Sequence, residues 1–327
     1  MNTQLRPMTL GEILDRTAEL YRNHFLLFAG ISSIFAGVIL VLEILHLGLI
    51  KLLGYPHIRP NLNWVYAVTL VVQVLAVLLV AGLSVAAFNR VVAWIYLGER
   101  ATVSAAINSI FLRLRRYLWL MTVIAFRAWM PLAVLYVGLF AIVFALLPGG
   151  SLFDPQAAAH HAPVNPASLA RVGFEALALF PLMIAAVIYG VLMSLRYSLA
   201  MAACVVEDLR TSDAIRRSVV LAKGTWGRIF VLGLLVTAIE YALSIILGFP
   251  FFIYLFKHLG GPLPLWILFE QQFSGFLITT LIGPIYATGL TLFYYDQRIR
   301  KEGFDIEWMM QAAGLSPQIE LPAPEHS

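Results

Sequence analysis

The sequence has one cysteine, few charged residues and no recognisable catalytic motif. Each of these features excludes some classes of protein. Cys204 alone can form neither an intrachain disulfide nor a cysteine-based metal site. The sequence contains no G-x-S-x-G elbow, phosphate-binding glycine loop or H-E-x-x-H helix. We therefore expect no catalytic residues, no metal and no cofactor, and we predict that the chain is not an enzyme. Charged residues make up only 12% of the chain, about half the share typical of a soluble domain.

Apolar residues are abundant instead. They make up 61% of the 327 residues, and the mean hydropathy is +0.85. A bilayer core requires about 20 mostly apolar residues per helix, and stretches of that length recur along the chain. The sequence predicts an all-α integral membrane protein, a six-helix bundle forming one membrane domain over residues 1–302, with a cytoplasmic tail over 303–327. We place the spans at about 25–46, 64–88, 118–147, 172–193, 229–254 and 266–292.

Three segments with the hydrophobic period of an amphipathic helix precede the first, third and fifth spans. They begin at Thr9, Thr102 and Thr211. In the first, Thr9 and Glu12 have the spacing of a capping box. We expect all three helices to lie at the cytoplasmic membrane interface. The order of interfacial helix, outward span and return span occurs three times in one orientation, which predicts a parallel pseudo-repeat.

The distribution of basic residues predicts the orientation. Seventeen of the 22 Lys and Arg residues fall before the first span, in the connections that carry the second and third amphipathic segments, or after the last span. Four fall in the three opposite connections, and Arg127 falls inside a span. Because cytoplasmic connections are enriched in Lys and Arg, we expect both termini to be cytoplasmic. The predicted location is a bacterial cytoplasmic (inner) membrane.

Two charged residues fall deep inside predicted spans. Arg127 lies about ten residues into span three and Glu240 about thirteen residues into span five, hence roughly 15 and 20 Å from the cytoplasmic edge. A charge near the middle of a bilayer costs about 2.5 to 3.5 kcal/mol on insertion scales and normally has a partner. We predict that the two face the bundle interior and pair or line a polar cavity. The pair would fix helix register, or it would serve transport or proton relay.

Two further groups of polar residues lie near the ends of the spans. An outer-face polar cluster is possible near the extracytoplasmic ends, although snorkelling to the interface explains the same residues; its members are Glu43, Glu175, Glu270 and Gln271. Basic residues near the cytoplasmic ends suit anionic lipid headgroups, although retention of topology alone explains them equally. These are Arg113, Arg115, Arg116, Arg216, Arg217, Lys223 and Arg228. Nucleic acid is not an expected partner, because these charges face the membrane boundary.

Three stretches together resemble a known family. They are RPMTLGEILDRTAELYRNHF at the start, CVVEDLRTSDAIRRSVVLAKG in the middle and LFYYDQRIRKEGFDIEW near the end. The sequence resembles the membrane domain attached to some bacterial glycerophosphodiester phosphodiesterases, and related stand-alone multi-spanning membrane proteins. In the fused relatives the chemistry belongs to a separate soluble barrel domain, and the residues after Glu302 are too few for one. The resemblance therefore implies a membrane module without an assigned reaction.

From these observations we expect a non-catalytic module that organises partner proteins or anionic lipid. One alternative is a transporter or lipid carrier that uses Arg127 and Glu240. Another is an accessory subunit of a separately encoded enzyme. The expected partners are membrane lipids with anionic headgroups on the cytoplasmic side, together with proteins that the sequence does not identify.

Overall fold

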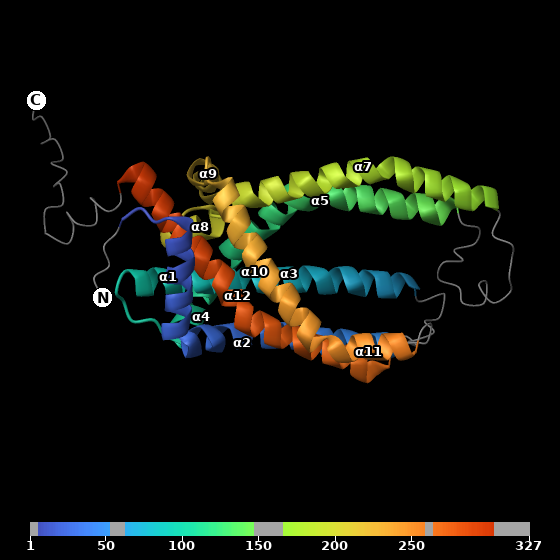
Figure 1. Cartoon of the computed structure of the whole chain (residues 1–327), viewed down its shortest axis with the longest axis horizontal. Coiled ribbons are helices and arrows are strands. Elements are labelled where there is room, and N and C mark those ends of the chain that lie inside the picture. The colour runs from blue at the N-terminus through green and yellow to red at the C-terminus, as the bar shows by residue number, and fades with distance from the viewer. Residues whose placement is uncertain (1–5, 53–62, 147–165, 259–263, 304–327) are drawn as a thin grey trace, which may run out of the picture.

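A computed structural model of the chain describes residues 6–52, 63–146, 166–258 and 264–303. The regular elements in these ranges are all α-helices (Figure 1). Their bounds are α1 Leu10–Asn23, α2 Phe25–Leu52, α3 Asn63–Tyr96, α4 Val103–Phe111, α5 Leu114–Leu146, α7 Pro166–Tyr197, α8 Ala200–Val206, α9 Thr211–Ala222, α10 Trp226–Leu247, α11 Phe249–Lys257 and α12 Leu265–Glu302.

The described residues include six segments that are long and apolar enough to cross a membrane. They are Phe25–Leu52, Val68–Tyr96, Leu114–Gly138, Leu179–Val206, Trp226–Leu247 and Leu265–Glu302. The predicted all-helical fold with six candidate spans is thereby confirmed, and it supports a multi-pass membrane protein. The last helix ends at Gly303, which adopts a left-handed conformation with φ of 66°, as helix C-caps commonly do. The rest of the predicted tail lies outside the described residues.

The fifth span differs from its predicted bounds of 229–254. Helix α10 ends at Leu247, and a separate short helix, α11, begins at Phe249. Pro250 lies in the first turn of α11, where its missing N–H is tolerated, whereas the interior of a continuous helix would lose a hydrogen bond there. A methyl group on Gly248 would meet the Ser244 carbonyl oxygen at 2.8 Å. The helix is therefore interrupted at Gly248, and a side chain at this position would overlap the preceding turn.

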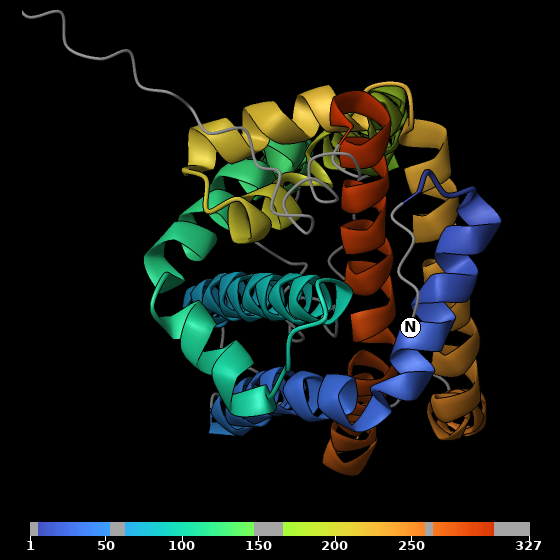
Figure 2. The ribbon, with the colours of Figure 1, turned by 90° about the vertical axis from the view of Figure 1, so that its left-hand side faces the viewer.

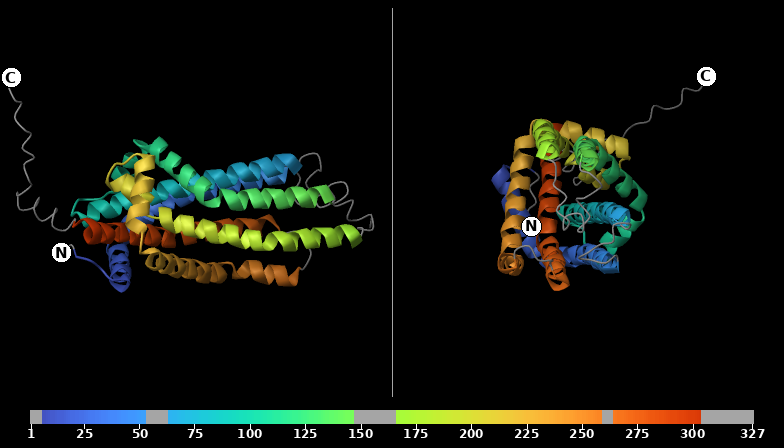
Figure 3. Two further views of the ribbon diagram at one scale, coloured as in Figure 1. Left: turned by 90° about the horizontal axis from the view of Figure 1, so that it is seen from above. Right: turned by 90° about the vertical axis from the view of Figure 1, so that its right-hand side faces the viewer.

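The long helices α2, α3, α5 and α7 run along the long axis of the molecule, and α10 and α12 cross it obliquely (Figures 1 and 3). Helices α5 and α7 pack together, and α2 packs against both α3 and α12. The short helices α1, α4, α8 and α9 gather at one end, on the left in Figure 1. We call this the basic end, because the arginine-rich connections lie there.

Burial is concentrated at the basic end. There α12 lies between α1 and α10 on one side and α3 on the other (Figure 2), and its residues 287–297 are all buried. Thr291 donates a hydrogen bond to the Asn89 side chain of α3 at 2.7 Å. Gly289 permits a close approach, since a methyl group there would lie 2.9 Å from a terminal carbon of Leu232 in α10. The last helix thus forms the centre of the core.

A fully buried carboxylate, Asp296, joins the start of the chain to its last helix. Its oxygens accept hydrogen bonds from the Met8 backbone N–H at 2.7 Å, from the Arg300 Nε at 3.0 Å and from the Gln297 side chain at 3.0 Å. Arg228 of α10 completes the cluster at 3.4 Å. Arg228 and Arg300 also donate to the Met8 carbonyl oxygen. Both backbone groups of Met8 are therefore held by residues that follow it by more than 200 positions.

Two of the three predicted threonine starts cap their helices. Thr9 forms the predicted capping box with Glu12, and Thr102 accepts a hydrogen bond from the Ala105 N–H at the start of α4. The pKa of Glu12 is lowered to about 2, chiefly by the hydrogen bond from the Thr9 backbone and then by Arg6. Thr211 is different: it is the first helical residue of α9, and the cap position belongs to Arg210, whose side chain forms no capping hydrogen bond.

Candidate anion-binding pocket

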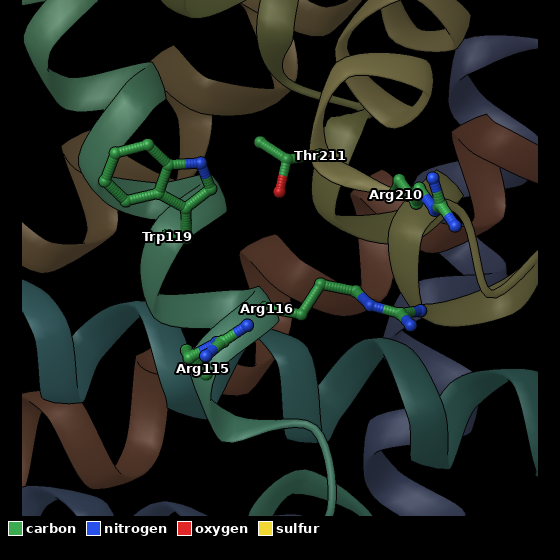
Figure 4. Close-up of a pocket in the computed structure, with 5 residues that line it drawn as sticks. All are labelled: Arg115, Arg116, Trp119, Arg210 and Thr211. Carbon is green, nitrogen blue, oxygen red and sulfur yellow. The ribbon is translucent and has the colours of Figure 1, made fainter.

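A basic pocket of about 440 Å³ opens where the starts of α5 and α9 meet (Figure 4). Helix α5 supplies Arg115, Arg116 and Trp119, and the start of α9 supplies Arg210 and Thr211. We refer to these five residues as the basic pocket. Three of the five carry a guanidinium group, which is suited to bidentate binding of phosphate or carboxylate.

The turns before the two helices set this geometry. Helix α4 ends at Phe111, and after Leu112 and Arg113 the chain turns into α5. Arg115 and Trp119 are four residues apart and therefore share one face of α5. The second turn includes Asp208, which has a φ of 57°, a left-handed conformation that aspartate tolerates better than most residues. That turn brings Arg210 and Thr211 to the side of α5.

Asp208 also pairs with the arginines of the other turn. Its carboxylate accepts hydrogen bonds from both Arg113 and Arg116, and its backbone carbonyl accepts a third from Arg116 at 2.9 Å. Arg116 therefore lines the pocket while it is held by an internal carboxylate. In contrast, the described part of the chain provides no ion-pair partner for Arg115 or Arg210. Two of the three pocket arginines have their charges available.

The charge around the pocket is positive on balance. The charged residues at the two helix starts are Arg113, Arg115, Arg116, Arg210, Asp208 and Asp213. Four arginines less two aspartates leave a formal charge of +2. The first N–H groups of α9 add a partial positive charge, and no side-chain cap occupies them. The arrangement can bind an anion, and among the described residues no three His, Cys, Asp or Glu side chains form a metal-binding group.

Only part of the predicted anionic-lipid set lines this pocket. Arg115 and Arg116 do. Arg113 pairs with Asp208, and Arg228 belongs to the Asp296 cluster. Arg216 is exposed on α9, Lys223 is exposed directly after its last residue, and neither lines the pocket.

Arg217 is bound between two carboxylates. It pairs with Glu207 at 2.9 Å and with Glu302 at 2.5 Å. Partial burial disfavours its charge, but hydrogen bonds to the two carboxylates outweigh that effect and raise the pKa of Arg217. Arg217 therefore serves the contact between α9 and the end of α12, and its charge is not available to a lipid headgroup.

The structure does not bring Arg127 and Glu240 together as an ion pair. Both residues lie in the described part of the chain, and no salt bridge joins them. Arg127 is exposed on α5, and Glu240 is half-buried on α10. The prediction that both face the interior of the bundle is wrong for Arg127, because the neighbouring Ala128 is the residue of that turn that is buried.

The predicted outer-face cluster is described in part. Glu270 accepts a hydrogen bond from Ser274 at 2.9 Å, and its other carboxylate oxygen is buried without a hydrogen-bond partner. Gln271 beside it is exposed, and Glu43 is half-buried on α2. Glu175 belongs to α7, but its side chain lies outside the described residues. No hydrogen bond or salt bridge within the described part of the chain joins Glu43 to Glu270.

Two pocket residues, Trp119 and Arg210, were not predicted from the sequence as parts of an anion site. Trp119 is an aromatic residue at the start of a span, a position typical of the membrane interface. Arg210 directly precedes a predicted helix start, where its charge lies close to the helix N-terminus. Both features are visible in the sequence. They indicate a shared pocket only once α5 and α9 are known to lie side by side.

Comparisons of the chain with protein-family models, curated proteins and solved structures found no match. The resemblance to the membrane domain of glycerophosphodiester phosphodiesterases stays a prediction.

Proposed function

We propose that this chain is a multi-pass protein of a bacterial cytoplasmic membrane, and that its basic end binds anionic lipid headgroups through the basic pocket. The observation that carries the proposal is the presence in one pocket, beside Trp119, of Arg115 and Arg210, which have no ion-pair partner among the described residues. The indole of Trp119 is 61% exposed, and an exposed tryptophan at the end of a span is typical of the headgroup region.

The orientation follows from the same end of the molecule. The arginine-rich connections and the short helices gather there, which favours placing the basic end on the cytoplasmic side. We also propose that α1, α4 and α9 are interfacial helices of a parallel threefold plan. Support comes from the element order, in which α1 precedes α2 and α3, α4 precedes α5 and α7, and α9 precedes α10 and α12, with the short α11 between the last two. In this role the protein acts without catalysis, and it organises anionic lipid or proteins that gather on it.

Native mass spectrometry of the protein in mild detergent tests lipid binding. The purified chain is titrated with phosphatidylglycerol, which is anionic, and with phosphatidylcholine, which is zwitterionic. We expect phosphatidylglycerol to bind more tightly to the wild type. A double variant, Arg115→Gln with Arg210→Gln, removes two charge-assisted hydrogen bonds worth about 1.5 kcal/mol or more each. The expected loss of about 3 kcal/mol corresponds to roughly 100-fold weaker binding.

The matched control is a double variant with the same change of charge outside the pocket, Arg216→Gln with Lys223→Gln. Both control residues are exposed, Arg216 on α9 and Lys223 at its C-cap, where each contributes only about 1 kcal/mol of general attraction to an anionic surface. If the two double variants lose affinity equally, the pocket has no special role. If the wild type does not distinguish the two lipids, the proposed function is wrong.

A further inference from the structure

An exposed cation lies in the middle of a candidate span. Arg127 follows Trp119 of α5 by eight residues, or about 12 Å along the helix, which places it near the middle of a hydrocarbon core about 30 Å thick. It is exposed, and none of the described residues forms a salt bridge or a hydrogen bond with its side chain. Tyr189 of α7 donates only to its backbone carbonyl. Because snorkelling serves residues near helix ends, Arg127 requires an anion at its own depth.

The chain carries such an anion on another helix. Glu240 follows Trp226, the first residue of α10, by 14 residues, or about 21 Å along the helix. Since α10 crosses the long axis obliquely, Glu240 lies at a smaller depth than this, similar to that of Arg127 (Figures 1 and 3). Within the described ranges its carboxylate has no ion-pair or hydrogen-bond partner. Two other carboxylates of the described spans, Glu43 and Glu270, lie closer to the ends remote from the basic end.

The two charges lie on different flanks of the molecule. Helix α7 packs against both α5 and α10, and it lies between them when the molecule is seen from above (Figure 3). Each charge has exposed apolar surface beside it, since Phe126 next to Arg127 and Tyr241 next to Glu240 are both exposed. A contact that joins these two flanks in different copies is heterologous, and it closes into a ring where the rotation between copies allows.

We propose that copies of this chain associate in the membrane through an ion pair between Arg127 of one copy and Glu240 of the next. Because all copies insert in one orientation, residues at a similar depth in two neighbouring copies can meet. Charges inside a membrane normally pair with one another, and one such contact supplies both residues with a partner. Glu240 is half-buried, so a long arginine side chain can still reach its carboxylate. The association does not depend on the basic pocket or on bound lipid.

Disulfide cross-linking between two differently tagged copies in one membrane tests the contact. Cys204 is replaced by alanine in both, so that no native thiol reacts. One copy then carries Phe126→Cys and the other Tyr241→Cys, which leaves both charges in place. We expect a cross-linked product that contains both tags. The control combines Phe126→Cys with Val38→Cys, an exposed position in the middle of α2, and should give only the background of random collisions.

Charge changes in the same two copies test the ion pair itself. Arg127→Gln in the first copy or Glu240→Gln in the second should lower the yield at limiting protein density about tenfold, because a charge-assisted hydrogen bond is lost. Arg127→Glu in the first copy alone should lower it at least as much, and adding Glu240→Arg in the second should restore it. Restoration would also show that the charge-reversed chains fold.

Three outcomes would overturn the proposal. The first is a yield no higher than that of the α2 control. The second is a yield that the two neutral variants leave unchanged, because apolar packing alone would then hold the copies together. The third is a cross-link that forms only when both cysteines are in one chain, which would mean that α5 and α10 approach each other within a single copy.

Discussion

Replacing Asp296 by asparagine tests how the basic end of the bundle is held together. The substitution keeps the shape of the side chain and changes one carboxylate oxygen into an NH₂ group. Asp296 is fully buried, and it accepts hydrogen bonds from Met8, Gln297, Arg228 and Arg300. An asparagine retains one acceptor and directs its new donor toward groups that are themselves donors. The arginines lose their counter-charge.

The magnitude follows from the burial of the partners. Removing one member of a buried ion pair costs about 3–5 kcal/mol. Here the Arg228 and Arg300 side chains keep 29% and 38% exposure, so water recovers part of the loss. We therefore expect the free energy of unfolding to fall by about 2–3 kcal/mol. The start of α1 should loosen first, because both backbone groups of Met8 depend on this cluster.

The single cysteine provides the assay. Cys204 is fully buried, so a thiol-reactive dye labels it only when the core opens. Unfolding by SDS in mild detergent, followed by this labelling, gives the change in stability. The control is Glu19→Gln, which breaks the partly exposed Arg16–Glu19 pair and should cost at most about 1 kcal/mol. If Asp296→Asn costs no more than Glu19→Gln, the cluster does not stabilise the fold as argued.

Three other substitutions test local features of the structure with the same assay. Gly289→Ala should destabilise by about 1–3 kcal/mol, because the new methyl group would overlap Leu232, whereas Gly37→Ala, where no atom lies within 4 Å, should stabilise by up to about 1 kcal/mol. Thr102→Ala removes the cap of α4 and should cost about 1 kcal/mol; an unchanged stability would show that the cap contributes nothing. Because the folded pKa of Glu12 is lowered to about 2, its contribution is complete above its unfolded pKa of about 4.3 and disappears as the pH falls toward 2. The stability difference between wild type and Glu12→Gln should therefore be constant from pH 5 to 8 and shrink steadily as the pH falls from 4 toward 2, and a difference that stays unchanged down to pH 2 would contradict the low pKa.

The membrane spans could be predicted from the sequence because lipid imposes a simple requirement of length and apolarity. The capping box at Thr9 was equally accessible, since its two residues are three positions apart. The break at Gly248 was missed because apolarity continues through it, although the Gly-Phe-Pro order carried the signal. Thr211 was misplaced by one position, because the preceding turn, with Asp208 in a left-handed conformation, decides where α9 begins.

The pocket could not be predicted, because its parts are far apart in the chain. Arg116 and Asp208 are separated by 92 positions, and nothing in either local sequence indicates the contact. The local sequence of an arginine cluster does not show whether its side chains face lipid headgroups or internal carboxylates. Arg113, Arg217 and Arg228 have carboxylate partners, whereas no carboxylate in the described ranges pairs with Arg115. For arginine, the deciding information is the position of the acids on other helices.

The hold of Asp296 on Met8 has a consequence for biosynthesis. A ribosome delivers Met8 near the beginning and Asp296 near the end, 288 residues later. The first helix therefore emerges long before its binding partner exists, and it must wait beside the membrane while the intervening spans are inserted. The start of α1 can therefore dock onto α12 only after α12 has been synthesised. A chain that ends before Asp296 cannot form this part of the core.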